Sequence, residues 1–199
     1  MKKIAFFDFD GTITTKDTFL EFIRFTKGLL PFCTGFLVNA PWIAAYQLGL
    51  VAPQVAKEKV LRFFFRNTPA AVFESYCDNF ARKRLPALVR PRALQEILRL
   101  KREGTQVVIV SASPENWITK WTSTIGVRLI ASRLEVKDGL ITGKLTGKNC
   151  RDEEKVARIK EQYTLTDYEE IYAYGDTRGD LPMLKMATKP YYKPFRRGA

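Results

Sequence analysis

Four aspartates fall into two close pairs, one near each end of the chain. Asp8 and Asp10 are two residues apart, and Asp176 and Asp180 are four residues apart. Carboxylate oxygens are ligands that Mg²⁺ prefers, and a carboxylate can also attack phosphorus or exchange a proton with a leaving group. The chain contains no histidine, which excludes Ser-His-Asp and Cys-His catalysis and a histidine-bound zinc. Its chemistry must therefore use carboxylates, lysines, hydroxyls, thiols or a hard metal ion.

Short apolar runs, each followed by a polar turn and a helical stretch, place these side chains. Strands are predicted at residues 3–9, 106–110 and 170–174. Helices are predicted at about 90–103, 114–125, 152–163 and 179–187. This alternation is typical of an α/β fold with a parallel sheet buried between helices. Ligands bind at the carboxyl ends of such strands, so we expect both aspartate pairs to meet Ser111 there. Residues 132–146, with Asp138-Gly139 in the middle, predict a β-hairpin beside the sheet.

Residues 16–86 interrupt the alternation. They read as consecutive helices divided by prolines, at about 17–27, 32–48, 54–66 and 69–85. We therefore predict an α/β core made of residues 1–15 and 87–199, with an all-helical insertion at 16–86.

The composition limits the class of protein and its partners. The chain has 199 residues, 46% of them hydrophobic, and a net charge of +12, which predicts a globular protein with anionic partners. Three cysteines at wide spacing, Cys33, Cys77 and Cys150, indicate free thiols in a reducing compartment. The apolar run at the N-terminus ends at Asp8, too early for a signal peptide.

Four motifs together resemble those of the haloacid dehalogenase superfamily. They are Asp8-Phe9-Asp10-Gly11-Thr12, Ser111 after the apolar run VVIV, Lys155, and GDTRGDLPML at 175–184. The helical insertion directly after the first motif resembles a C1 cap, which is typical of the subfamily that includes phosphoserine phosphatase. The resemblance implies a Rossmann-like parallel sheet between helices, a helical cap and Mg²⁺-dependent phosphatase activity on a phosphorylated substrate.

The resemblance also implies roles for individual residues. It makes Asp8 the nucleophile, which forms an aspartyl-phosphate, and Asp10 the general acid and base. Lys155 would offset the negative charge, and Lys148 is the alternative for that role. Phosphate-binding positions would be Thr12, Ser111 and Ala112. Metal-site positions would be Asp8, Asp10 through its backbone carbonyl, Asp176 and, in direct or indirect contact, Asp180.

Phosphoserine phosphatase is the first comparison for the substrate. Its cap uses an acidic residue nine positions after the nucleophile, where this chain has Asp17, and an arginine, for which Arg62 and Arg66 are candidates. Strong alternative interpretations remain: Asp17 also suits the cap of a helix N-terminus before an apolar run, and the two arginines also suit a solvated surface.

Residues 28–56 contain no charged residue, and lysines flank them on both sides. Three interpretations remain open: packed helices within the cap, a surface that contacts a membrane or an apolar substrate, or a membrane span. The segment, together with SASPENW at 111–117, resembles the branch that includes phosphatidylglycerophosphatase C, which dephosphorylates a lipid headgroup. The resulting expectation is a cytoplasmic enzyme, peripheral to the inner face of the membrane, that contacts anionic lipid through residues 28–59. The basic tail at 189–197 would add to this contact.

A protein that only binds an anionic surface or nucleic acid is the remote alternative. The charge of +12 and the aromatic content of 13% would suit it. However, Phe6, Phe7, Phe19, Phe22 and Phe25 fall at the spacing of core residues, and no nucleic-acid motif is visible. We expect no nucleic-acid partner, and the sequence leaves the oligomeric state open.

Overall fold

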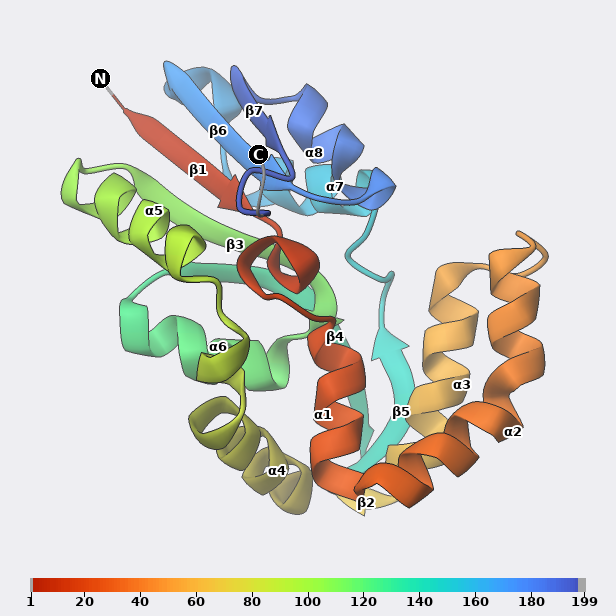
Figure 1. The fold of residues 1–199 in the computed structure, drawn as a ribbon. Coiled ribbons are helices and arrows are strands. Elements are labelled where there is room, and N and C mark those ends of the chain that lie inside the picture. Colours follow the sequence, from red (N-terminus) through yellow and green to blue (C-terminus); the bar gives the residue numbers. More distant parts are fainter. Residues whose placement is uncertain (1, 197–199) are drawn as a thin grey trace.

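The computed structural model describes residues 2–196, which fold around one seven-stranded sheet (Figure 1). The strands are β1 (Lys3–Phe7), β2 (Thr68–Pro69), β3 (Gln106–Pro114), β4 (Arg128–Lys137), β5 (Leu140–Thr146), β6 (Glu170–Gly175) and β7 (Lys189–Tyr192). The helices are α1 (Thr18–Lys27), α2 (Leu29–Gln47), α3 (Pro53–Phe65), α4 (Ala70–Lys83), α5 (Pro91–Arg102), α6 (Glu115–Ile125), α7 (Glu153–Gln162) and α8 (Leu181–Lys185). Short helical turns lie at Phe9–Ile13, Leu85–Leu88, Leu165–Asp167 and Arg178–Asp180.

The sheet order is β2-β5-β4-β3-β1-β6-β7, and β4, β3, β1, β6 and β7 run parallel. The three strands expected from the apolar runs are β1, β3 and β6, so their placement is confirmed. β7 and the first part of β4 were not foreseen. Both lie outside the three central strands, and β7 is an edge strand whose residues are all exposed, so neither carries a continuous buried apolar run.

The residues of β1 alternate between two cores, as the pleat of a strand requires. Ala5 and Phe7 pack on the side that α5 and α6 cover, while Ile4 and Phe6 pack on the side of α7 and α8. Continuous apolar runs therefore belong to strands that are buried on both faces. The arrangement is the three-layer α/β fold expected from the sequence.

The predicted hairpin is present as β4 and β5. Asp138 and Gly139 form its turn with positive φ angles of 51° and 74°, as a two-residue turn between right-twisted strands requires. β5 also pairs with the two-residue strand β2, which lies between α3 and α4. The insertion is thus helical apart from β2, a strand too short to have a sequence pattern of its own.

Aromatic side chains from α1, α3, α4 and α6 form the centre of the helical insertion. The ring of Phe22 lies 4.4 Å from Trp117 and 5.4–5.5 Å from Phe65, Phe73 and Phe80, between ring centroids. The phenylalanines expected at core positions are buried, except for Phe25, which is 39% exposed. These aromatic rings therefore stabilise the fold and are not free to stack on nucleic-acid bases.

The helix α2 is apolar but largely exposed. Only Gly35 and Asn39 are buried among its 19 residues. A Cβ atom added at Gly35 would lie 2.1 Å from the Phe64 ring, so the glycine permits the close contact with α3. Among the described residues, α2 is the one helix long and apolar enough to cross a membrane. Only 11% of its most apolar stretch is buried inside the protein. It is therefore not a core helix of the insertion.

Candidate active site

Asp8 follows β1 at the carboxyl end of the sheet, where its amide N–H donates to the Tyr174 carbonyl of β6 over 2.8 Å. Lys155, near the start of α7, donates from Nζ to Asp8 Oδ1 over 2.6 Å and to Asp180 Oδ1 over 2.7 Å. A third bond, to the Val110 carbonyl of β3, measures 2.9 Å. Lys155 is 2% exposed. Its buried ammonium group thus connects the end of β1, strand β3 and the residue before α8.

The charges of this centre are strongly perturbed. Burial raises the pKa of Asp8 to about 7, against the lowering effect of Lys155. Burial also disfavours the charge on Lys155, but Asp8 and Asp180 together hold its pKa above the usual value. The pKa of Asp180 is lowered, because Lys155 and donors from Thr177 outweigh its burial. Lys155 therefore stays cationic between two carboxylates.

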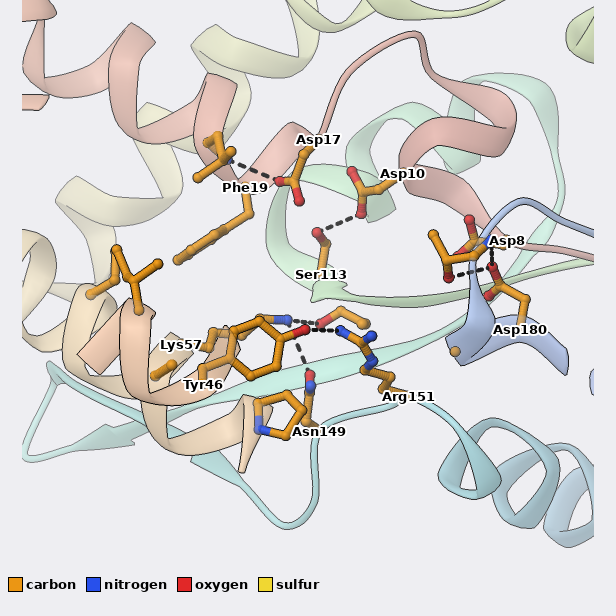
Figure 2. A pocket seen from close by; sticks show the side chains of 18 of the residues that line it. Asp8, Asp10, Asp17, Phe19, Tyr46, Lys57, Ser113, Asn149, Arg151 and Asp180 are labelled. Carbon is orange, nitrogen blue, oxygen red and sulfur yellow. Dashed lines mark hydrogen bonds between the residues drawn. The ribbon is translucent and has the colours of Figure 1, made fainter. Parts of the chain in front are cut away.

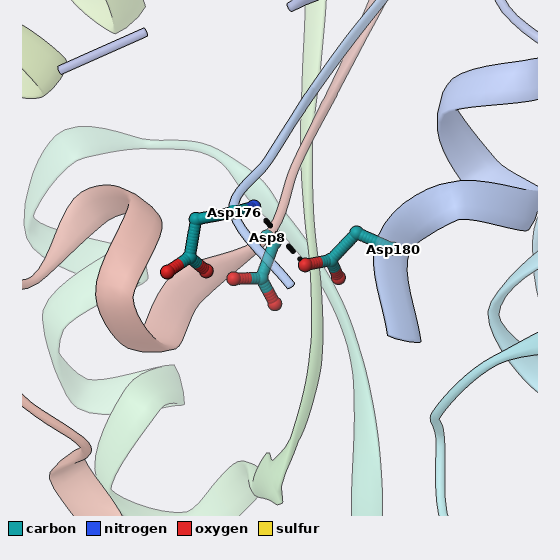
Figure 3. A group of neighbouring side chains, drawn as sticks. All are labelled: Asp8, Asp176 and Asp180. Carbon is teal, nitrogen blue, oxygen red and sulfur yellow. Dashed lines mark hydrogen bonds between the residues drawn. The ribbon is translucent and has the colours of Figure 1, made fainter. Parts of the chain in front are cut away.

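Asp176 and Asp180 lie beside Asp8 at the end of β6 (Figure 3). Asp180 Oδ2 accepts from the backbone N–H groups of Asp176 and Thr177 over 3.1 and 2.9 Å, and from the Thr177 hydroxyl over 2.8 Å. Asp176 Oδ1 accepts from the Thr12 hydroxyl over 3.2 Å, and its Oδ2 pairs with Arg196. Asp180 is thus fully engaged with protein donors, while the carboxylate of Asp176 faces the first motif.

The glycine of the first motif makes this approach possible. Gly11 has a φ of 87°, and a Cβ atom there would lie 2.5 Å from Asp176 Oδ2. A side chain at this position would clash with the Asp176 carboxylate and would also strain the turn.

The donor set suits a hard divalent cation. Oxygens of Asp8, Asp176 and Asp180 all lie within 4.8 Å of one another, and all three residues are buried. Lys155 is the buried cation among them, and the side chain of Arg196 is 47% exposed. Three buried carboxylates exceed the buried positive charge, and oxygen-only ligands fit Mg²⁺.

Asp10 points its carboxylate away from this cluster (Figure 2). Its Oδ1 accepts from the Thr18 N–H and hydroxyl, each over 2.6 Å. Its Oδ2 accepts from Ser113 Oγ over 2.6 Å and Ser111 Oγ over 3.4 Å. Sequence reasoning singled out Ser111 but not Ser113 or Thr18. The spacing of two residues within a strand, which puts Ser113 on the same side as Ser111, was the available signal.

A cavity of about 370 Å³ opens over these groups between the sheet and the insertion. The carboxylates, Lys155 and Ser113 lie on the sheet side. The insertion supplies mainly apolar side chains, namely Phe19, Leu20, Phe36, Ile43, Ala56 and Val60. The site is thus polar where the aspartates lie and apolar where α1, α2 and α3 face them.

Two further cations, Lys57 and Arg151, line the cavity together with Tyr46 and Asn149 (Figure 2). Lys57 of α3 donates to the Ala112 carbonyl over 2.8 Å and to Asn149 Oδ1 over 3.1 Å. Arg151 donates to the Tyr46 hydroxyl of α2 over 3.1 Å. Burial lowers the pKa of Lys57 to about 8. Each contact joins the insertion to the core.

Sequence reasoning treated Lys57 only as a flanking charge and missed Tyr46, Asn149 and Arg151. A signal for Lys57 did exist. The cavity-lining residues of α3 are Pro53, Ala56, Lys57 and Val60, which follow the i, i+3, i+4, i+7 spacing of one helix face. Tyr46, Asn149 and Arg151 come together only in the tertiary structure.

The other candidates divide between the cavity and the surface. Ala112 and Asp17 line the cavity. Asp17 also caps α1 through Leu20 N, and burial together with the nearby Asp10 raises its pKa to about 6. Arg62 packs against β5 at Gly143, and Arg66 is exposed at the end of α3. Neither arginine is among the residues that line the cavity, whereas Lys57 is.

Lys148, the alternative to Lys155, is exposed. The basic tail is placed only in part. Lys189 pairs with Glu170 and Arg196 with Asp176, while Arg197 lies outside the described residues.

Comparisons with known proteins extend over nearly the whole chain. The family model for haloacid dehalogenase-like hydrolases matches residues 5–185. Protein CicA of Caulobacter vibrioides is 36% identical over 192 residues, which cover 96% of this chain and 85% of that protein. A histidinol-phosphatase of Neisseria meningitidis serogroup C is 25% identical, with 96% and 89% covered. A substrate-bound phosphoserine phosphatase structure has the same fold, with a TM-score of 0.71 at 21% identity over 96% of this chain and 86% of that one.

Proposed function

The chain belongs to the haloacid dehalogenase-like hydrolase family, and we propose that this phosphatase hydrolyses phosphomonoesters with Mg²⁺ through an aspartyl-phosphate on Asp8. The observation that carries the proposal is the buried contact of Lys155 with Asp8 and Asp180 beside Asp176. A carboxylate held in this way is oriented and electrostatically supported as a nucleophile.

The proposed reaction has two steps. In the first, an Asp8 oxygen forms a bond to phosphorus while the bond from phosphorus to the substrate oxygen breaks, and Asp10 gives its proton to the departing alkoxide. In the second, Asp10 accepts a proton from a water molecule that attacks the aspartyl-phosphate, and the Asp8 carboxylate and inorganic phosphate are released. The hydroxyls of Ser113 and Thr18 hold Asp10 toward the cavity for both transfers.

Asp8, the Asp10 carbonyl and Asp176 are the groups proposed to hold Mg²⁺, which would neutralise phosphoryl charge. Asp180 is proposed to position Lys155 and the Asp176 backbone, since its own oxygens already accept four bonds. Thr12 orients Asp176. Ser111 and the Ala112 segment are proposed to contact the phosphoryl group.

For the substrate we propose a phosphomonoester with an apolar body, presented at or near a membrane, such as phosphatidylglycerophosphate. The apolar walls from α1, α2 and α3 support an apolar body. Lys57 and Arg151 line the same cavity and would suit a second anionic group of the substrate, such as a phosphodiester. The free state of all three cysteines fits a cytoplasmic enzyme.

A small amino-acid-like phosphate, such as phosphoserine, is the second candidate. Asp17 and Lys57 face the same cavity with opposite charges, which would suit an amine and a carboxylate. One relative is named a histidinol-phosphatase, and histidinol is a small molecule with an amine. Asp17 already accepts the Leu20 N–H, so less of its capacity is free for an amine.

The first experiment measures phosphate release from an aryl phosphate with Mg²⁺, with excess chelator and in an Asp8→Asn variant. Both the chelator and the variant are expected to remove turnover. Asp138→Asn is the matched control, because it makes the same change in a hairpin turn that accepts asparagine. Turnover retained by Asp8→Asn would rule out the nucleophile.

A panel of phosphomonoesters then separates the two substrate classes. It includes phosphoserine, glycerol 3-phosphate and phosphatidylglycerophosphate in mixed micelles. A kcat/KM at least ~10-fold higher for the lipid would support the apolar-body proposal. A preference for phosphoserine would favour the second candidate.

A further inference from the structure

We infer that the outer surface of α2 and the turn after it, residues 29–50, docks on an anionic lipid bilayer. The observation is that α2 and this turn leave several large apolar side chains exposed to solvent. Leu30 is 79% exposed, Leu37 76%, Leu48 74%, Leu50 73% and Val38 62%. Large apolar side chains concentrated in one exposed segment mark an interaction site.

The charges around this surface identify its partner. No charged residue lies between Lys27 and Lys57. In the wider segment 22–73 there is one acidic residue, Glu58, and it accepts hydrogen bonds from Gln54 and the Leu145 N–H. Outside the cavity, which Lys57 lines, the basic residues of that segment are Arg24, Lys27, Lys59, Arg62 and Arg66. Uncharged apolar residues flanked by cations match acyl chains beneath anionic headgroups.

The inner side of α2 is already occupied, which fixes how the helix can lie. Gly35 packs against Phe64 of α3, and Phe36, Ile43 and Tyr46 line the catalytic cavity. A helix crossing the bilayer would have to leave these contacts. We therefore place α2 in the plane of the interface, with its outer side in lipid and its inner side facing the cavity.

The same charges argue against a second copy of the chain as the occupant. A symmetric contact between two α2 surfaces would bring the two sets of basic residues together without acidic partners. The aromatic residues suit an interface with lipid. Trp42 is 38% exposed and lies beneath Lys59 Nζ at 4.1 Å from the ring centroid, and indole rings favour the headgroup region.

This inference deepens the proposed function, because docking on α2 would bring the open cavity to the lipid surface. It does not depend on catalysis, so the two can fail separately. Vesicle binding is measured without substrate or Mg²⁺, and hydrolysis of a soluble aryl phosphate is measured without lipid.

The test is cosedimentation with vesicles of phosphatidylcholine alone or with phosphatidylglycerol. The wild-type protein should bind the mixed vesicles and lose most of that binding at high salt. The variant Leu30→Glu with Leu37→Glu changes two exposed positions seven residues apart, on one side of the helix. It should lower the apparent partition coefficient at least ~10-fold.

The matched control is Leu98→Glu with Val136→Glu, two positions that are 40% and 50% exposed in α5 and β4. It makes the same change in net charge away from α2 and should bind vesicles as the wild type does. Both double variants should hydrolyse the soluble aryl phosphate at the wild-type rate, which also reports that they fold.

Three results would overturn the inference. They are absence of wild-type binding to the anionic vesicles, equal loss of binding in the two double variants, and a wild-type dimer in solution that only the Leu30/Leu37 variant dissociates. The last result would assign the surface to a second copy of the chain.

Discussion

The buried carboxylate cluster and the helix α2 differ in which side chains are buried and which are exposed. At the end of the sheet, four charged side chains (Asp8, Lys155, Asp176 and Asp180) are at most 6% exposed. In α2, large apolar side chains are exposed, and the buried residues are a glycine and an asparagine. Burying charged groups costs stability, and apolar side chains left in solvent contribute none through burial. Stability alone therefore explains neither region.

The largest effect is expected when the proton donor of the proposed reaction is removed. Asp10→Asn should reduce turnover of an aryl phosphate by at least ~10³-fold, because general acid and base assistance contributes at both steps. The amide can still accept from Thr18. Intact-protein mass spectrometry should detect a covalent phosphoryl group on the variant after substrate is added. Near-normal turnover would contradict the role of Asp10.

Removal of the central lysine tests whether the buried charges depend on one another. Lys155→Met leaves Asp8 and Asp180 buried without their cation, so the free energy of unfolding should fall by about 3 kcal/mol. Urea denaturation in the presence of a chelator measures this. Lys160→Met, at an exposed position of the same helix, is the control and should change stability by less than ~0.5 kcal/mol. Similar stabilities of the two variants would mean that Lys155 does not compensate these carboxylates.

Lys57 of α3 contacts the core from the cap, so its substitution tests whether the cap side of the cavity contributes to substrate binding. Lys57→Met should lower kcat/KM for a substrate with a second anionic group about 10-fold. Lys59→Met, two residues away, should not. Burial lowers the pKa of Lys57 to about 8, so its side chain is a charged ammonium below that pH and a neutral amine above it. The wild-type KM for that substrate should therefore rise above pH 8, whereas the KM of Lys57→Met should not show this rise.

The smallest effect is expected at Glu21, a buried carboxylate that is not among the residues lining the cavity. Glu21 accepts from Arg84 over 2.6 Å and from Lys16 over 3.1 Å. Burial alone would raise the pKa of Glu21, but these partners lower it below its ordinary value of 4.5. A carboxylate whose pKa is lowered in the folded state stabilises the fold at every pH above its ordinary, unfolded-state pKa. This contribution is lost as the pH falls through the lower pKa of the folded state.

The expected effect of Glu21→Gln is a loss of about 1 kcal/mol at pH 7, after allowance for the exposure of Arg84. The difference from wild type should disappear at the acidic end of a series of urea melts, and kcat should not change. A constant difference at every pH, or a loss of activity, would show that Glu21 acts otherwise.

Sequence reasoning located the strand ends and the aspartate pairs because local patterns encode them. β1 is apolar on both faces, and Asp8 comes directly after it. Arg151 could not be identified in this way, because its partner Tyr46 lies in a distant segment. The helix-face spacing of α3 offered a signal for Lys57, but its partner Asn149 is also distant in the sequence. For α2, composition gave the absence of charge, but only the packing against α3 shows which side chains remain exposed.

The central position of β1 determines when the site can form. Asp8 pairs with a lysine 147 positions later, and Thr12 with an aspartate 164 positions later. Contacts of such long range form slowly, and during synthesis they must wait for the C-terminal strands. Much of the helical insertion emerges from the ribosome before β3. A chain that stops before β6 would thus carry the apolar surface of α2 without a catalytic centre, which would make it prone to aggregation before it can act as an enzyme.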